Sequence, residues 1–167
     1  RGQVREGLRY VRSVPELWIP LVMMTIVGTL SFNFQVVMPL FVTRTFGGTD
    51  RDFTTLFAVL SLGSLAGALI NARRRMLEVR DMIISTAMFG VALLAFAASP
   101  SLALAYPIGI GLGLASITFL TSNTALVQMK ATSAMRGRVL ALQAIVFLGT
   151  TPIGGPILRS EEHTSEL

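Results

Sequence analysis

The sequence predicts an all-α polytopic membrane protein with five transmembrane helices. Of its 167 residues, 52% are hydrophobic and only 14% are charged, whereas a soluble domain has about 25% charged residues. The charges also gather in short segments, and the long stretches between them contain no Asp, Glu, Lys, Arg or His. A helix needs about 20 such residues to cross the 30 Å hydrocarbon core of a bilayer. Buried helices of a large soluble protein would instead show shorter apolar runs with polar stripes.

The first two expected helices are separated by a polar loop. A linker, residues 1–17, carries four arginines and is expected in the cytoplasm. The first transmembrane helix, residues 18–42, ends before the segment TRTFGGTDR, whose glycines and charges predict a loop. The second helix, residues 53–72, starts after that loop and stops before three consecutive arginines.

The other three expected helices have equally clear boundaries. Residues 82–99 follow the charged pair Arg80 and Asp81 and end at a Ser-Pro-Ser turn. Residues 102–127 begin after that turn and stop shortly before Lys130, and residues 139–158 follow the segment MRGR. The isolated prolines inside these stretches are tolerated in membranes, because neighbouring groups satisfy the carbonyls that they free.

The basic residues of the connections predict the orientation. Eleven lie in the N-terminal segment and in the second and fourth loops, against two in the first loop and none in the third. Loops on the cytoplasmic side carry the excess of Lys and Arg. The N-terminus and the second and fourth loops are therefore expected in the cytoplasm. Basic residues spread over such loops indicate topology rather than a nucleic-acid surface, so no nucleic-acid partner is expected.

The most specific motif is GALINARRRMLEVRD, which begins at Gly67. It resembles the signature G-x-x-x-D-R-x-G-R-R of the major facilitator superfamily. Gly67 and Asn71 match the spacing, with Asn in place of the acid, and the basic cluster is Arg73, Arg74 and Arg75. In a rocking transporter such a cluster forms a cytoplasmic gate, because arginines bond helix ends or a facing carboxylate. The alternative is ordinary charge of a cytoplasmic loop.

Two further segments extend this resemblance over most of the first 158 residues. MRGRVLALQ, with Arg136 and Arg138, is similar to a cytoplasmic gate loop of superfamily members, and REGLRYVRSVPELW is similar to the linker before the seventh helix of bacterial drug and siderophore exporters. The resemblance implies helices seven to eleven of a twelve-helix transporter, with the N-terminal half of the same chain missing. A shift of about 86 residues places VLSLGS over IVFLGT, as the inverted three-helix repeats of such a six-helix half would.

The resemblance also implies a substrate cavity. The first and fourth helices of each half line the cavity in superfamily members. The corresponding polar and aromatic residues here are Thr29, Phe32, Asn33, Phe34, Thr118, Ser122 and Asn123. For each of them the alternative role is interhelical hydrogen bonding or core packing.

Glycines predict the positions where helices approach closely. The expected helix-packing residues are Gly63, Gly109, Gly113, Gly154 and Gly155, and the first three belong to the spacings Gly63/Gly67 and Gly109/Gly113. The segment GTTPIGGP also resembles a glycine-proline motif of superfamily antiporters, which hints at export.

No catalytic constellation is present, so no enzyme, metal or cofactor is expected. The chain has no cysteine and a single histidine, His163, so thiolate chemistry and clustered imidazole ligands are excluded. That histidine lies in the final segment RSEEHTSEL, residues 159–167, which resembles a translated sequencing adapter. We therefore expect these nine residues to be a non-native tail.

The sequence thus predicts a fragment of a secondary active transporter in the bacterial plasma (inner) membrane. Its expected partners are the lipid bilayer, a small-molecule substrate and the missing half. The expected action is export of small amphipathic molecules by alternating access, and any proton-carrying carboxylate must lie in the missing half because the expected spans contain no ionisable residue. The alternative is a transport-inactive polytopic membrane scaffold or sensor.

Overall fold

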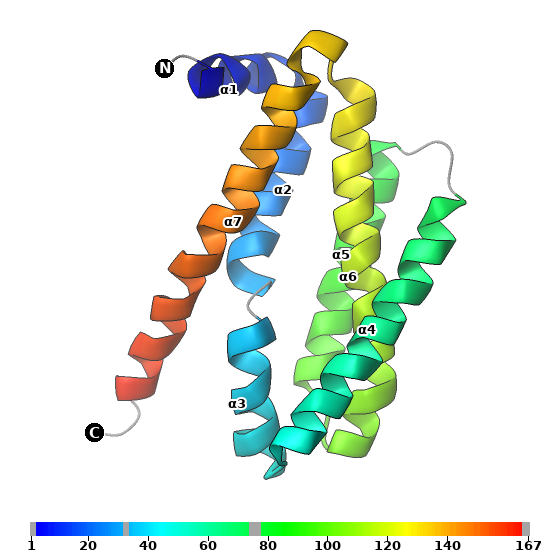
Figure 1. Ribbon diagram of the computed structural model, residues 1–167, viewed down its shortest axis with the longest axis vertical. Coiled ribbons are helices and arrows are strands. Elements are labelled where there is room, and N and C mark those ends of the chain that lie inside the picture. The colour runs from blue at the N-terminus through cyan, green and yellow to red at the C-terminus, as the bar shows by residue number, and fades with distance from the viewer. Residues whose placement is uncertain (1–2, 32–33, 74–77, 165–167) are drawn as a thin grey trace. The chain divides into compact units, whose positions relative to one another are not determined.

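The computed structural model describes the backbone of residues 3–31, 34–73 and 78–164, and the side chains of residues 6–28, 37–73, 78–147 and 149. This part of the chain forms helices and short connections without a strand, which confirms the all-α prediction. The helices are α1 (Gln3–Ser13), α2 (Pro15–Ser31), α3 (Phe34–Phe46), α4 (Asp50–Ala72), α5 (Val79–Ala97), α6 (Leu102–Lys130) and α7 (Ser133–Thr164) (Figure 1).

Three of these helices, α4, α5 and α6, are long and apolar enough to cross a membrane. The pair of α1 and α2 makes a fourth candidate if it counts as one bent span. The described part of the chain therefore has the helices of a multi-pass membrane protein, whereas the count of five and the inverted repeat remain predictions.

The first expected span covers parts of two described helices, α2 and α3. Residues 18–42 were expected to form one helix. The structure describes α2 as far as Ser31 and α3 from Phe34, and residues 32–33 lie outside the described part, so this span stays a prediction. At the other end of the chain, the expected boundary at residue 158 falls within α7, where side chains are not described, so the non-native tail stays a prediction.

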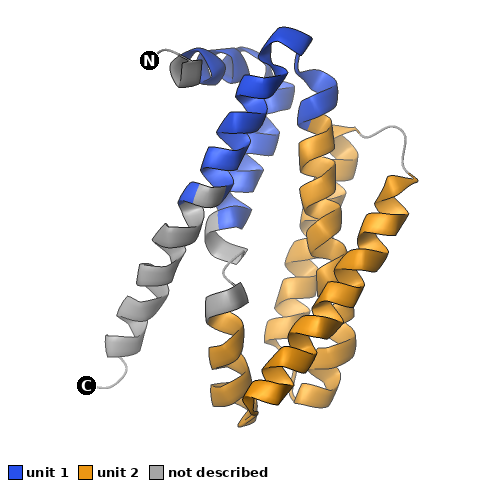
Figure 2. Cartoon of the chain, viewed as in Figure 1, with its two compact units in different colours: residues 1–36, 127–167 blue, residues 37–126 orange. Residues whose placement is uncertain are grey.

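The chain divides into two compact units (Figure 2). Unit 1 contains residues 1–36 and 127–167, and unit 2 contains residues 37–126. Each unit is held together by different contacts, and each is described below on its own.

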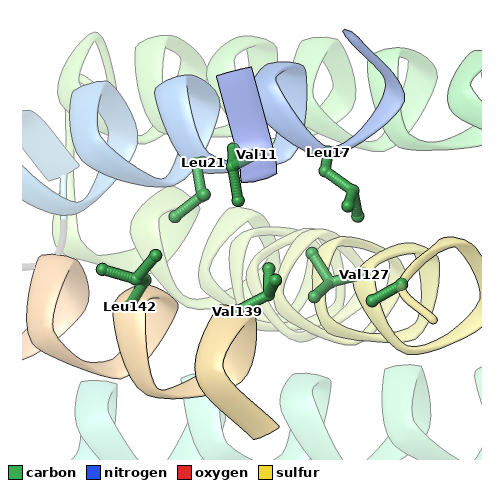
Figure 3. Close-up of a cluster of buried hydrophobic side chains, with 7 residues drawn as sticks. Val11, Leu17, Leu21, Val127, Val139 and Leu142 are labelled. Atoms are coloured by element: carbon green, nitrogen blue, oxygen red, sulfur yellow. The ribbon is translucent and has the colours of Figure 1, made fainter. Parts of the chain in front are cut away.

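In unit 1, α7 packs against both α1 and α2. A sharp bend of 114° separates α1 from α2. The bend falls at Val14, directly before Pro15, because the ring of a proline disfavours helical geometry in the residue before it. Pro15 itself suits the first position of the next helix, which needs no backbone donor there. Buried side chains from both helices then meet the end of α6 and the start of α7 in one hydrophobic cluster: Val11, Leu17, Leu21, Val127, Ala131, Val139 and Leu142 (Figure 3).

In unit 2, α4 and α6 approach closely because glycines line the contact. A Cβ added at Gly63 would overlap the carbonyl oxygen of Ile110, and one added at Gly113 would overlap that of Leu60. A Cβ at Gly67 would lie 2.5 Å from Cγ2 of Ile117 and 2.8 Å from the Leu114 carbonyl oxygen. These three positions therefore admit no side chain while the two backbones keep their separation.

The starts of α4 and α5 are both fixed by an acidic side chain in the first turn. The Asp52 carboxylate accepts a hydrogen bond of 2.8 Å from the Thr49 backbone N–H, and Asp81 accepts one of 2.9 Å from that of Glu78. Such reciprocal caps satisfy donors that a helix start leaves free. Both helix starts are thus determined by residues three positions apart in the sequence.

Candidate functional site

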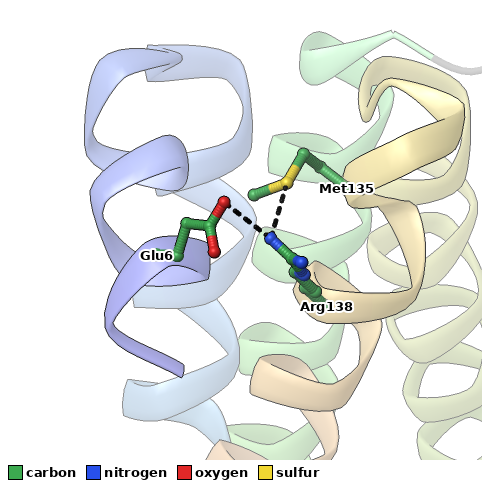
Figure 4. Close-up of polar contacts among 3 residues, drawn as sticks. All are labelled: Glu6, Met135 and Arg138. Carbon is green, nitrogen blue, oxygen red and sulfur yellow. Dashed lines mark hydrogen bonds and ion pairs between the residues drawn. The ribbon is translucent and has the colours of Figure 1, made fainter. Parts of the chain in front are cut away.

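The first group of polar contacts joins α1 and the start of α2 to the end of α6 and the start of α7, within unit 1. The Arg138 guanidinium Nη1 lies 2.8 Å from Oε1 of Glu6, and it also donates to the Met135 sulfur at 3.6 Å (Figure 4). Lys130 Nζ lies 3.0 Å from Oε2 of Glu16. We call the residues of these contacts, together with the pair described next, the linker cluster.

A tyrosine completes the linker cluster. The Tyr10 hydroxyl donates to Oγ1 of Thr132 at 3.4 Å and accepts from the Thr132 backbone N–H at 3.2 Å. The Thr132 hydroxyl and the Thr132 backbone N–H can both donate hydrogen bonds to a phenolate at Tyr10, so they lower the pKa of the Tyr10 hydroxyl from its ordinary value. Two ion pairs and one hydroxyl pair therefore join α1 and the start of α2 to the residues around the α6–α7 connection.

The ion pairs of the linker cluster are exposed and hence weak. The side chains of Arg138 and Glu6 are 36% and 58% exposed, and those of Lys130 and Glu16 are 38% and 52% exposed. Exposed pairs of this kind contribute about 0.2–1 kcal/mol each. They can therefore form and break without a large change in stability, which suits contacts that orient a helix rather than hold a core.

The second group of polar contacts lies between α4 and α6, within unit 2. Asn71 Nδ2 donates to Oγ1 of Thr118 at 3.0 Å, and the Thr118 hydroxyl donates in turn to the Leu114 carbonyl at 2.7 Å. Both side chains are buried. Thr118, expected in the substrate cavity, thus bridges to Asn71, expected in the cytoplasmic gate.

Two further buried polar residues follow on α6. Ser122 and Asn123 are 1% and 0% exposed, and Asn123 Nδ2 lies 4.0 Å from the Met82 sulfur. The Ser122 hydroxyl and Oδ1 of Asn71 have no hydrogen-bond partner. A buried polar atom without a partner costs about 1–3 kcal/mol. The group therefore retains one free acceptor and one free hydroxyl among apolar helices.

The expected packing glycines divide into two kinds. Gly63 and Gly113 lie where α4 and α6 approach most closely, as does Gly67. At Gly109 an added Cβ would meet side-chain atoms of Leu56, Phe96 and Val59 at 3.5–3.9 Å, which are ordinary contacts. Gly154 and Gly155 lie in α7, where the structure describes no side-chain surroundings.

The remaining expected site residues are described in part or not at all. Arg73 and Arg136 are exposed. Thr29 and Phe34 lie in α2 and α3, but their side chains are not described. The residues that lie outside the described part are Phe32, Asn33, Arg74 and Arg75.

Unit 2 also carries an apolar groove between α5 and α6, with a volume of about 560 Å³. Its lining residues are Ile84, Ala87, Met88, Val91, Ala92, Gly111, Leu114 and Ala115. No charged side chain lines it, so it offers dispersion contacts alone. Within the described part of the chain, no group of three His, Cys, Asp or Glu is placed to hold a metal ion.

Comparison with protein families decides the class of protein. The model of the transmembrane secretion effector family, a branch of the major facilitator superfamily, matches residues 1–159. The chain belongs to this family. Neither curated proteins nor solved structures give a match.

Membership of the transmembrane secretion effector family confirms the superfamily resemblance predicted from the sequence. It also identifies the chain as a multi-pass membrane protein of a transporter family, and it points to a non-enzymatic role. The fine assignment of residues to gate and cavity is not decided by the match.

Sequence analysis gave no site role to six members of the linker cluster: Glu6, Tyr10, Glu16, Lys130, Thr132 and Met135. A signal for three of them was available. The linker contains two acids, the fourth loop contains three basic residues, and the charge count assigned both segments to the same side of the membrane. No comparable signal exists for the pairing of Tyr10 with Thr132, because hydroxyls are common in loops.

Proposed function

We propose that this chain forms one half of a secondary active transporter that exports small amphipathic molecules by alternating access. The observation that carries the proposal is the match to a transporter family along residues 1–159. The family's description as a secretion effector favours export over uptake. The half that completes the transporter would supply the other cavity wall and a membrane carboxylate for proton coupling.

The proposed substrate class follows from the uncharged helices. Before its last turn, α6 carries no polar side chains other than hydroxyls and one amide. Of these, Ser122 and Asn123 are buried among apolar side chains. Such groups accept or donate single hydrogen bonds but cannot neutralise a charged substrate. Amphipathic and neutral compounds therefore fit better than phosphates or sugar acids.

The linker cluster is the proposed cytoplasmic latch of unit 1, with Arg138 as its best-defined member. An ion pair between Glu6 and Arg138 holds α1 against the start of α7 while the pair is formed. Since exposed pairs are weak, a conformational change of a few kcal/mol can open them. The exposed residues Arg73 and Arg136 are proposed to act in the closed gate with the other half of the transporter.

A transport assay on the full-length protein tests the function. Proteoliposomes with an imposed proton gradient should move a lipophilic fluorescent compound, and Asn33→Ala should change turnover or substrate preference at unchanged protein abundance. Gly67→Leu should instead lower abundance. If Asn33→Ala only lowers abundance, Asn33 is a structural bridge and not a cavity residue. If no compound moves although the protein is folded, the scaffold or sensor role replaces transport.

The proposed orientation has its own test. The chain lacks cysteine, so single cysteines report which side of the membrane is accessible. We expect Arg74→Cys in the full-length protein to resist an impermeant thiol reagent in intact cells and to react in inverted vesicles. Labelling from outside intact cells would contradict a cytoplasmic second loop.

A further inference from the structure

One flank of unit 1 combines basic and apolar side chains that face away from the protein. Leu8, Arg9 and Arg12 of α1 are exposed, as is Trp18 near the start of α2. Residues three and four positions apart are neighbours on a helix surface, so Arg12 lies beside both Leu8 and Arg9. The Arg12 guanidinium carbon lies 5.9 Å from the centre of the Trp18 ring, within the range of a cation–π contact.

This flank carries positive charge without a matching acid. The two carboxylates nearest in the sequence are already engaged, Glu6 with Arg138 and Glu16 with Lys130. Among the side chains that the structure describes, neither Arg9 nor Arg12 takes part in an ion pair. An anion that approaches the flank therefore meets two guanidinium groups and no competing carboxylate.

The geometry of α1 and α2 favours a lipid over an acidic protein segment. The bend of 114° means that α1 cannot continue the direction of α2. If α2 enters the bilayer, α1 runs along the surface of the bilayer. Trp18 then lies at the level where the apolar part of α2 begins. Tryptophan is enriched at this level of membrane proteins, and arginine stems reach along apolar surface to place their charge at the headgroups.

We propose that Leu8, Arg9, Arg12 and Trp18 form a binding site for the headgroup of an anionic phospholipid. The guanidinium groups of Arg9 and Arg12 donate hydrogen bonds to the phosphate oxygens. Leu8 and Trp18 contact the glycerol and the first acyl carbons. Lipid binding at this site requires α1 to lie at the membrane surface, and it does not require transport. A failure of the lipid-binding test therefore leaves the proposed transport function testable, and the reverse also holds.

Trp18 provides a direct measurement because it is the only tryptophan of the chain. The full chain is reconstituted in phosphatidylcholine vesicles that contain an equal amount of either brominated phosphatidylglycerol or brominated phosphatidylcholine, and bromine quenching of Trp18 is compared. We expect phosphatidylglycerol to be preferred by about thirtyfold, which is the order expected for two arginines near a membrane surface. Added salt should reduce the preference, since it screens exposed charges.

Matched variants test the residues. Arg9→Gln with Arg12→Gln should abolish the preference, whereas Arg9→Lys with Arg12→Lys should retain most of it because the charge remains. Arg51→Gln with Arg80→Gln removes the same number of charges elsewhere and should change nothing. Equal quenching by both lipids in the unaltered protein would overturn the proposal. An absence of quenching by either lipid would do so as well, and would indicate that a protein segment covers Trp18.

Discussion

The contacts within unit 1 differ in kind from the contacts within unit 2. Unit 1 joins α1 to α7 through a small hydrophobic cluster and exposed ion pairs such as that of Glu6 with Arg138. Unit 2 joins α4 to α6 through direct backbone contact at Gly63 and Gly113 and through a buried amide–hydroxyl bond. Backbone contact tolerates no displacement, whereas exposed ion pairs re-form after one. The difference indicates that adjustable contacts belong to unit 1 and fixed ones to unit 2.

The largest expected effect is in the fixed contact of unit 2. Gly63→Leu places a side chain against the Ile110 carbonyl, so α4 and α6 must separate. We expect a loss of about 3 kcal/mol in the free energy of unfolding, at the upper end for overpacked sites. Thermal unfolding of the detergent-purified protein and its abundance in membranes measure the loss.

Gly111→Leu serves as the control for that substitution, because an added Cβ at Gly111 meets nothing within 4 Å. It should cost little and leave the abundance unchanged. Equal losses for Gly63→Leu and Gly111→Leu would show that helix propensity and not backbone contact is responsible.

An intermediate effect is expected at the hydrogen bond between Asn71 and Thr118. Thr118→Val removes the acceptor and leaves the buried amide without a partner. Interhelical hydrogen bonds in membrane proteins contribute about 0.6–2 kcal/mol, so we expect a loss of about 1 kcal/mol in unfolding free energy.

Thr121→Val provides the comparison, since the exposed Thr121 hydroxyl bonds only to the Ile117 carbonyl of its own helix. Its loss should be smaller than that of Thr118→Val. A double substitution with Asn71→Leu should cost less than the sum of its two single changes. Additive costs would exclude a coupled pair.

The smallest expected effect is in unit 1. Glu6→Gln breaks the ion pair with Arg138, yet exposed pairs contribute less than about 1 kcal/mol. We expect almost unchanged thermal stability, and the remaining difference should vanish at high salt. The reversed pair, Glu6→Arg with Arg138→Glu, should behave like the unaltered protein.

A transport measurement tests whether the ion pair between Glu6 and Arg138 has a function. If the linker cluster is a latch, Glu6→Gln should alter the turnover of the full-length transporter although its stability is unchanged. Arg80→Gln removes an exposed charge on the same expected side of the membrane and is the control for non-specific electrostatics. Identical turnover in Glu6→Gln and the unaltered protein would assign the ion pair to surface chemistry alone.

The sequence predicted those properties that depend on composition and spacing. Charge-free stretches long enough to cross a bilayer predicted the all-helical membrane protein, and the motif around Gly67 predicted the superfamily, which the family match confirms. The glycine spacing also marked one small-residue face of α4, but a spacing does not reveal what lies opposite it. That the Ile110 carbonyl lies opposite Gly63 depends on tertiary packing.

Long-range pairs were beyond prediction for the same reason. Asn71 and Thr118 were assigned to different parts of a transporter from local motifs, yet they form one hydrogen bond. Glu6 and Arg138 lie at opposite ends of the chain, and nothing local in either segment specifies the other.

The acidic caps at the starts of α4 and α5 have a consequence for biogenesis. The Asp52 and Asp81 caps each use only the residues of the same first turn, so each helix can begin as soon as that turn has left the ribosome. The glycine contact with α6 becomes available later, after residue 113 has been synthesised. A helix start fixed in this local way does not depend on a packing partner that is synthesised later.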